Sequence, residues 1–275
     1  MTQTLLVVWR ESLEAALIVG ILLTYVGRSG LQQGVRYVWG GTIVASLLAI
    51  ALGAASGSAV ASLDPDTQEM VHAAILFAAT AVLTWMVLWM HANARGLKGD
   101  LHRKADAAMA TGRLLGLAAV AFVAVFREGI ETVLFLWGIV AQQPVGGALP
   151  LLLAGVTGGV LAVATAWCFF RGFAFLDLRT FFRVTGVLLL LVAGGLLMAG
   201  VNKLIMLDRL PPLVPQIWNT SWLVRDDSVP GAILSALIGY RSRPSLLEVL
   251  ALAAYLPAML WLLRRADSAP VGHAA

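Results

Sequence analysis

The fold is decided by a long apolar run that carries three charges, TLLVVWRESLEAALIVGILLTYV, at residues 4–26. A second run of the same kind, AVAFVAVFREGIETVLFLWG, occupies residues 119–138. A helix needs roughly 20 apolar residues to cross a bilayer, and both runs reach that length. Both also contain the pentad Arg-Glu-X-X-Glu. The first expectation for this chain is therefore two apolar helices with charges embedded in them.

The composition of the whole chain also indicates a membrane protein. Of its 275 residues, 60% are hydrophobic and 12% are charged, whereas soluble domains have about 25% charged residues. This balance excludes a soluble enzyme and a disordered chain. It also excludes a nucleic-acid-binding protein, because the basic residues behind the formal charge of +4 lie between apolar runs. The single cysteine, Cys168, lies in an apolar run, which excludes a disulfide framework and a cysteine-based metal site.

Seven apolar segments are long enough to span a membrane, which predicts an all-α polytopic protein with a single membrane domain over residues 1–275. The segments are 4–27, 37–60, 70–92, 114–140, 149–170, 181–206 and 246–263. Lys and Arg gather in the connections after spans 1, 3 and 5 and in the C-terminal tail, and the connections after spans 2 and 4 have none. The positive-inside rule then predicts that the N-terminus faces out and the C-terminus faces in.

The pentads also predict an internal repeat. They are 117 residues apart, and three spans separate their starting points, so the two copies run in opposite directions through the membrane. This is the pattern of an inverted 3+3 repeat, with repeat 1 at about 4–92 and repeat 2 at about 114–206. The outer segment 207–245 and a last helix at 246–263 follow. Pairs of small residues four apart, such as Gly53/Gly57 and Gly155/Gly159, are expected to allow close helix packing.

Within each pentad, helical spacing places both glutamates on one face and puts the arginine within reach of the second glutamate. A charge at the centre of a span costs about 2.5–3.5 kcal/mol on insertion scales, so these side chains must face the protein interior or a wet cavity. Four carboxylates against two arginines leave a formal charge of −2, which favours cation binding over purely structural ion pairs. The candidate metal ligands are Glu11, Glu14, Glu128 and Glu131, with Arg10 and Arg127 as supporting residues.

The two pentads resemble those of the oxidase-dependent, high-affinity iron permeases of fungi and their bacterial counterparts. The stretch LTWMVLWM at 83–90 is similar to the third span of the bacterial members, and residues 239–249 are similar to the start of their last span. The resemblance extends over residues from about 5 to 260.

This resemblance implies that the chain imports iron, as Fe³⁺, across the plasma or inner membrane and has no enzymatic activity. It implies that the pentad glutamates are ligands or relay groups and that the arginines support them. The acidic outer mouth of the family corresponds to Glu69, and His72 stands where the bacterial pattern has a second glutamate. The family also implies a partner protein outside the membrane that oxidises or binds iron.

Three alternatives remain open at the level of the sequence. Oxygen ligands suit several hard ions, and carboxylates with a histidine also fit Fe²⁺, so the chain could carry another cation such as Mn²⁺ or Pb²⁺. A membrane-embedded metalloenzyme is the second alternative, although segment 207–245 has no histidine. The third is an assembly subunit that transports nothing, which would tolerate glutamine at the pentad glutamates. No cofactor is expected; iron is the transported substrate.

Overall fold

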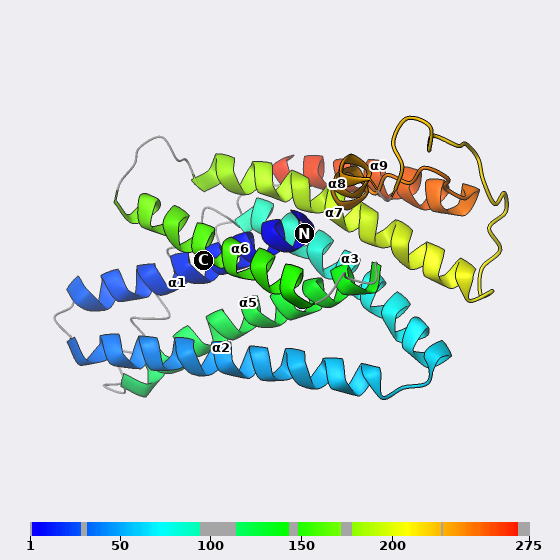
Figure 1. Ribbon diagram of the computed structural model, residues 1–275. Helices are drawn as coiled ribbons and strands as arrows, with labels where there is room; N and C mark the ends of the chain where they lie inside the picture. Colours follow the sequence, from blue (N-terminus) through cyan, green and yellow to red (C-terminus); the bar gives the residue numbers. More distant parts are fainter. Residues whose placement is uncertain are drawn as a thin grey trace. The chain divides into compact units, whose positions relative to one another are not determined.

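The computed structural model describes residues 2–28, 32–93, 114–142, 148–171, 178–226 and 228–268. Within these ranges all regular structure is helical (Figure 1). The long helices are α1 (Thr2–Arg28), α2 (Gln32–Ala61), α3 (Pro65–Asn93), α5 (Leu114–Gln142), α6 (Ala148–Phe170), α7 (Leu178–Met206) and α9 (Leu246–Ser268), and a short helix is α8 (Val229–Ile238). Five of them, α2, α3, α6, α7 and α9, are long and apolar enough to cross a membrane. The other two long helices, α1 and α5, carry the charged pentads.

Each predicted span corresponds to one long helix, with ends that differ by no more than five residues. The difference at α3 matters for function, because this helix starts at Pro65 and not at residue 70. Asp64 caps it, since the Thr67 N–H donates a hydrogen bond of 2.9 Å to Oδ2 of Asp64. Glu69 and His72, expected at an outer connection, therefore lie on the helix itself. The basic connection 94–113, on which the predicted orientation partly depends, lies outside the described residues.

The described helices form two compact units. The first unit contains α1, α2, α6 and α5 as far as Trp137. The second contains α3, α7, α8, α9 and the last residues of α5. Each unit thus combines helices from both halves of the chain, and both pentads belong to the first unit.

In the first unit, α1 packs along α6 and α2 packs along α5, and a glycine makes each approach close. A Cβ atom on Gly158 of α6 would lie 2.9 Å from the carbonyl oxygen of Leu5 in α1. A Cβ atom on Gly41 of α2 would lie 2.2 Å from the carbonyl oxygen of Ala118 in α5. Gly41 and Gly158 are 117 residues apart, which is also the separation of the two pentads. Two glycines with the same separation as the pentads therefore bring the pentad-bearing helices close to their neighbours.

The close approach of α1 and α6 yields a first prediction. The close helix packing expected at Gly155 and Gly159 is not found among the described residues, because a Cβ atom at either would have no neighbouring atom within 4 Å. Gly158→Ala is expected to lower the free energy of unfolding by roughly 1–3 kcal/mol, since the new methyl group meets α1 backbone. Gly159→Ala is the matched control, and it should leave stability unchanged or raise it slightly. Thermal unfolding in detergent compares the two, and equal midpoints would contradict the contact.

In the second unit, α3 and α7 run antiparallel. A Cβ atom on Gly200 near the end of α7 would meet the Phe77 ring early in α3, and one on Gly186 would meet Val87 near the other end of α3. The short apolar segment predicted at 229–240 forms α8, which Ser228 caps at its start. This antiparallel arrangement brings the C-terminal end of α7 to the N-terminal end of α3.

The link from α8 to α9 is ordered by polar contacts. Gly239 ends α8 in the left-handed region, with φ of 69°, which favours glycine because a Cβ atom is disfavoured there. At the start of α9, the Ser245 N–H donates to Oε2 of Glu248 at 2.8 Å, and the Glu248 N–H donates to Oγ of Ser245 at 3.3 Å. These two bonds form a capping box. Arg241 adds an ion pair to Glu248, with Nε 3.2 Å from Oε1.

Candidate metal centre

The two pentads lie well inside α1 and α5, and their glutamate side chains are buried. Each of the four glutamates is 9% exposed or less; Glu11 is 1% exposed and Glu128 is 6% exposed. The second pentad has glycine at its centre for a packing reason, since a Cβ atom on Gly129 would lie 2.6 Å from Cβ of Ala49 in α2. The burial that the sequence predicted is confirmed for the four glutamates.

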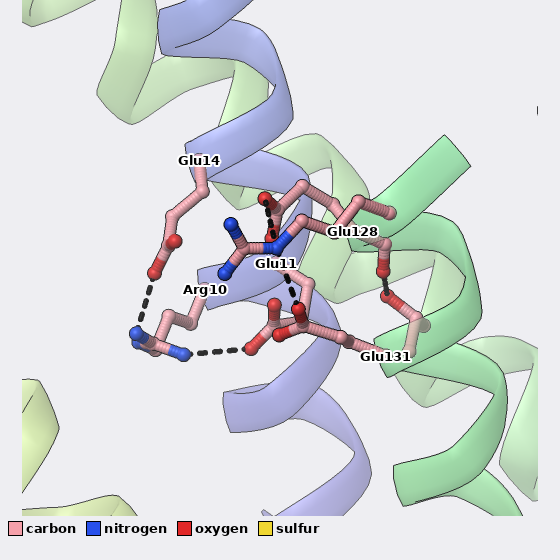
Figure 2. A network of polar contacts seen from close by, with 7 residues as sticks. Arg10, Glu11, Glu14, Glu128 and Glu131 are labelled. Carbon is pink, nitrogen blue, oxygen red and sulfur yellow. Dashed lines mark hydrogen bonds and ion pairs between the residues drawn. The ribbon is translucent and has the colours of Figure 1, made fainter. Parts of the chain in front are cut away.

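Three of the four carboxylates converge. One oxygen each from Glu11, Glu128 and Glu131 lies within 4.8 Å of the others. Glu11 comes from α1 and the other two from α5, and the side chains point toward one another (Figure 2). Oxygen ligands bind cations at about 2.0–2.6 Å, so this spacing suits one ion bound by all three side chains. Glu11 and Glu128 hold the same place in their pentads, so the two copies meet at equivalent residues.

Arg10 holds both glutamates of the first pentad. Its Nη1 lies 2.8 Å from Oε1 of Glu11, and its Nη2 lies 2.6 Å from Oε1 of Glu14. The side chain of Arg10 is only 2% exposed, so these ion pairs are shielded from water. Glu14 extends toward Arg10 (Figure 2) and is not among the three clustered carboxylates. Of the four candidate ligands, Glu14 is therefore the one outside the group whose oxygens lie within 4.8 Å of one another.

The second arginine is placed differently. Nε of Arg127 lies 2.9 Å from Oε1 of Glu131 but 4.0 Å from Oε1 of Glu128. Its side chain is 40% exposed, so it is much less enclosed than that of Arg10. Each pentad thus keeps the ion pair predicted between residues four apart, but only the first arginine is buried and closely paired with both of its glutamates.

The clustered carboxylates have oxygens that the protein leaves unsatisfied. Oε2 of Glu11, of Glu128 and of Glu131 is buried and accepts no hydrogen bond from the described residues. A buried, charged oxygen without a partner is costly, and a bound cation removes that cost. The ligands are all carboxylate oxygens, which suits a hard cation. The donor set of the cluster therefore fits a metal ion.

Glu69 and His72 lie one turn apart on α3 and belong to the second unit. Lys203, in the last turn of α7, forms an ion pair with Oε2 of Glu69. Nδ1 of His72 lies 3.9 Å from the same oxygen. The structure brings the two predicted residues together and adds Lys203, which the sequence analysis did not single out. The signal that could have identified Lys203 is an antiparallel pairing of the third and sixth spans.

Comparison with known proteins agrees with the resemblance of the pentads. Residues 1–264 match the Iron permease FTR1 family. The chain is 32% identical to Ferrous iron permease EfeU of Yersinia pestis over 258 residues, which cover 93% of this chain and 90% of that protein. It is 31% identical to Ferrous iron permease EfeU of Escherichia coli O6:H1 over 258 residues, which cover 93% of this chain and 92% of that protein. No solved structure matches the chain.

Proposed function

This chain belongs to the FTR1 iron permease family, and from that membership we propose that it imports iron across the plasma or inner membrane through the clustered glutamates of its pentads. The family makes it a multi-pass membrane transporter and not an enzyme. The observation that carries the proposal is the buried convergence of Glu11, Glu128 and Glu131, with carboxylate oxygens within 4.8 Å of one another. Iron is the substrate of this cluster.

We assign different roles to the six charged residues of the pentads. Glu11, Glu128 and Glu131 bind the ion together, because their oxygens converge and each has one that accepts no hydrogen bond from the described residues. Glu14 is the relay group, since it lies one turn from Glu11 on the same helix and offers the ion its next carboxylate. The supporting residues Arg10 and Arg127 keep their glutamates ionised and fix their rotamers.

Seven spans in an inverted 3+3 repeat plus one, with the N-terminus out and the C-terminus in, complete the proposal. One support is the shared separation of 117 residues between the pentads and between Gly41 and Gly158. A second is the exchange of partners in the first unit, where α1 packs along α6 and α2 approaches α5. A two-fold axis in the membrane plane generates such an exchange between repeats.

Two kinds of observation point to different valences of the transported iron. Carboxylate oxygens are hard ligands and favour Fe³⁺. The curated relatives are named ferrous iron permeases, and His72 beside Glu69 adds a nitrogen that also suits Fe²⁺. Uptake of ascorbate-reduced iron and of citrate-bound ferric iron, measured side by side, decides between them.

Glu69 and His72 form the proposed outer binding site. They lie at the start of α3, on the side that the predicted orientation places outside. Fe³⁺ hydrolyses strongly in neutral water, so this site would receive iron from a partner protein that oxidises or binds it. The pentad cluster would then be the second binding site on the path.

Radio-iron uptake into proteoliposomes tests the proposal. The wild-type chain is expected to take up iron, and Glu128→Gln with Glu131→Gln is expected to reduce uptake to background, because two of the three clustered charges are removed. Glu248→Gln is the matched control: it replaces a carboxylate that is also buried, and glutamine can still complete the capping box. This control should keep most of the wild-type uptake.

Three results would change the conclusion. If the double variant took up iron as fast as the wild type, the pentads would have a structural role and would not bind the transported ion. In a competition assay, excess Mn²⁺ or Pb²⁺ is added together with iron. If one of these ions abolished iron uptake and was itself transported instead, the chain would be a carrier of that cation. Wild-type protein that neither takes up nor binds iron would contradict the proposed function altogether.

A further inference from the structure

We propose that Lys203 is a tethered counter-cation that occupies the Glu69–His72 site until a metal ion displaces it, and that it thereby sets which cations the site accepts. This inference rests on the proposed function of that pair as the outer binding site. It adds a specificity-determining residue from a different helix, α7.

The geometry places the Lys203 ammonium where a cation would bind. Lys203 and His72 approach the same oxygen of Glu69, Oε2, from different helices. A metal ion held by the Glu69 carboxylate and by Nδ1 of His72 would have to lie beside that oxygen. Lys203 and the ion therefore exclude each other.

The ion pair is placed so that it can open. The Glu69 side chain is 40% exposed and that of Lys203 is 21% exposed, and ion pairs in such settings contribute little net stability. The flexible four-carbon stem of lysine allows the ammonium to swing away without movement of α7. Lys203 also lies in the last turn of its helix, where the helix dipole favours a positive charge whether or not Glu69 is its partner.

Such an arrangement discriminates between cations by charge. A monovalent ion gains no more from the single Glu69 carboxylate than Lys203 already does, so it does not displace the ammonium. A divalent or trivalent ion interacts more strongly with the carboxylate and also binds the imidazole nitrogen of His72. The outer site then admits multivalent metal ions and rejects sodium and potassium.

Mn²⁺ binding to the full-length chain in nanodiscs, followed by electron paramagnetic resonance, tests the proposal. The background carries Glu128→Gln and Glu131→Gln, so that the outer site is observed without the pentad cluster. Lys203→Gln is expected to bind Mn²⁺ up to roughly fivefold more tightly, because the ion no longer has to displace the ammonium from Glu69. Lys203→Arg keeps the charge and should keep the original affinity. The gain should vanish when Glu69→Gln is added.

A second measurement uses the unmutated chain, in case Lys203→Gln does not fold. Mn²⁺ is expected to increase the acetylation of Lys203 by an amine-reactive reagent several-fold, as read by mass spectrometry, because the displaced ammonium becomes accessible. Unchanged or reduced acetylation would overturn the proposal, as would Lys203→Gln that binds Mn²⁺ no more tightly than Lys203→Arg. Both outcomes concern the outer site alone, so they are separate from a failure of iron uptake through the pentads.

Discussion

Glu128→Gln is expected to weaken metal binding on the order of 100-fold, whereas Glu14→Gln should change it by less than about fivefold. Glu128 contributes one of the three converging oxygens, and its Oε2 accepts no hydrogen bond from the described residues. Glu14 lies outside that cluster and is paired with Arg10 through a contact of 2.6 Å. Replacing a pentad glutamate by glutamine is thus expected to lower the metal affinity strongly at Glu128 and weakly at Glu14, because only the Glu128 carboxylate belongs to the cluster.

Equilibrium binding of iron or Mn²⁺ to the purified chain, with Lys203 and the outer site intact in both variants, measures this difference. Transport gives the complementary result, because Glu14→Gln is expected to slow uptake strongly while binding persists, as a relay group should. Equal losses of affinity in the two variants would contradict the assignment of Glu14 as a relay and would make all four glutamates ligands of one ion.

Arg10→Met is expected to destabilise the chain by about 3–5 kcal/mol, because it leaves two buried carboxylates without their counter-ion. The Arg10 side chain is 2% exposed and lies within 2.8 Å of both Glu11 and Glu14. Arg127→Met removes the equivalent residue of the second pentad, but that side chain is 40% exposed and closely paired only with Glu131. Its loss should cost about 1 kcal/mol, in the range of exposed ion pairs.

Thermal unfolding in detergent and the yield of membrane-inserted protein compare the two arginine variants. Adding Glu14→Gln to Arg10→Met should restore part of the lost stability, since it removes one of the stranded charges. If Arg127→Met proved as damaging as Arg10→Met, the contrast between a buried and a partly exposed arginine would be wrong. A drop in uptake without a drop in stability would instead make Arg10 a group on the ion path.

Much of the metal centre could be predicted from sequence because its parts are local. Glu11 and Glu14 are three residues apart, so any helix through residues 4–27 places them on one face. Charge in an apolar run must be buried in protein, which predicted the low exposure of these glutamates. The ion pairs of Arg10 with Glu14 and of Arg127 with Glu131 followed from the same spacing, and both are confirmed.

Other features could not be predicted because they depend on which helices meet. The glycine that brings α6 against α1 is Gly158, although Gly155 and Gly159 have the more familiar spacing. Lys203 reaches Glu69 from 134 residues away in the chain. The residue pattern within one span predicts neither contact, since both depend on the crossing angle and register of two helices.

The sequence by itself determined that this chain is a membrane protein, that its pentads lie within apolar helices, and that each pentad has its own arginine–glutamate pair. These are consequences of hydropathy and of the 3.6-residue turn, which act within one segment. The tertiary structure alone decided that Glu11 joins Glu128 and Glu131, that Arg10 is buried while Arg127 is partly exposed, and that Lys203 forms an ion pair with Glu69. Those outcomes require close packing of segments more than 100 residues apart, and close packing depends on the shape of every side chain between them.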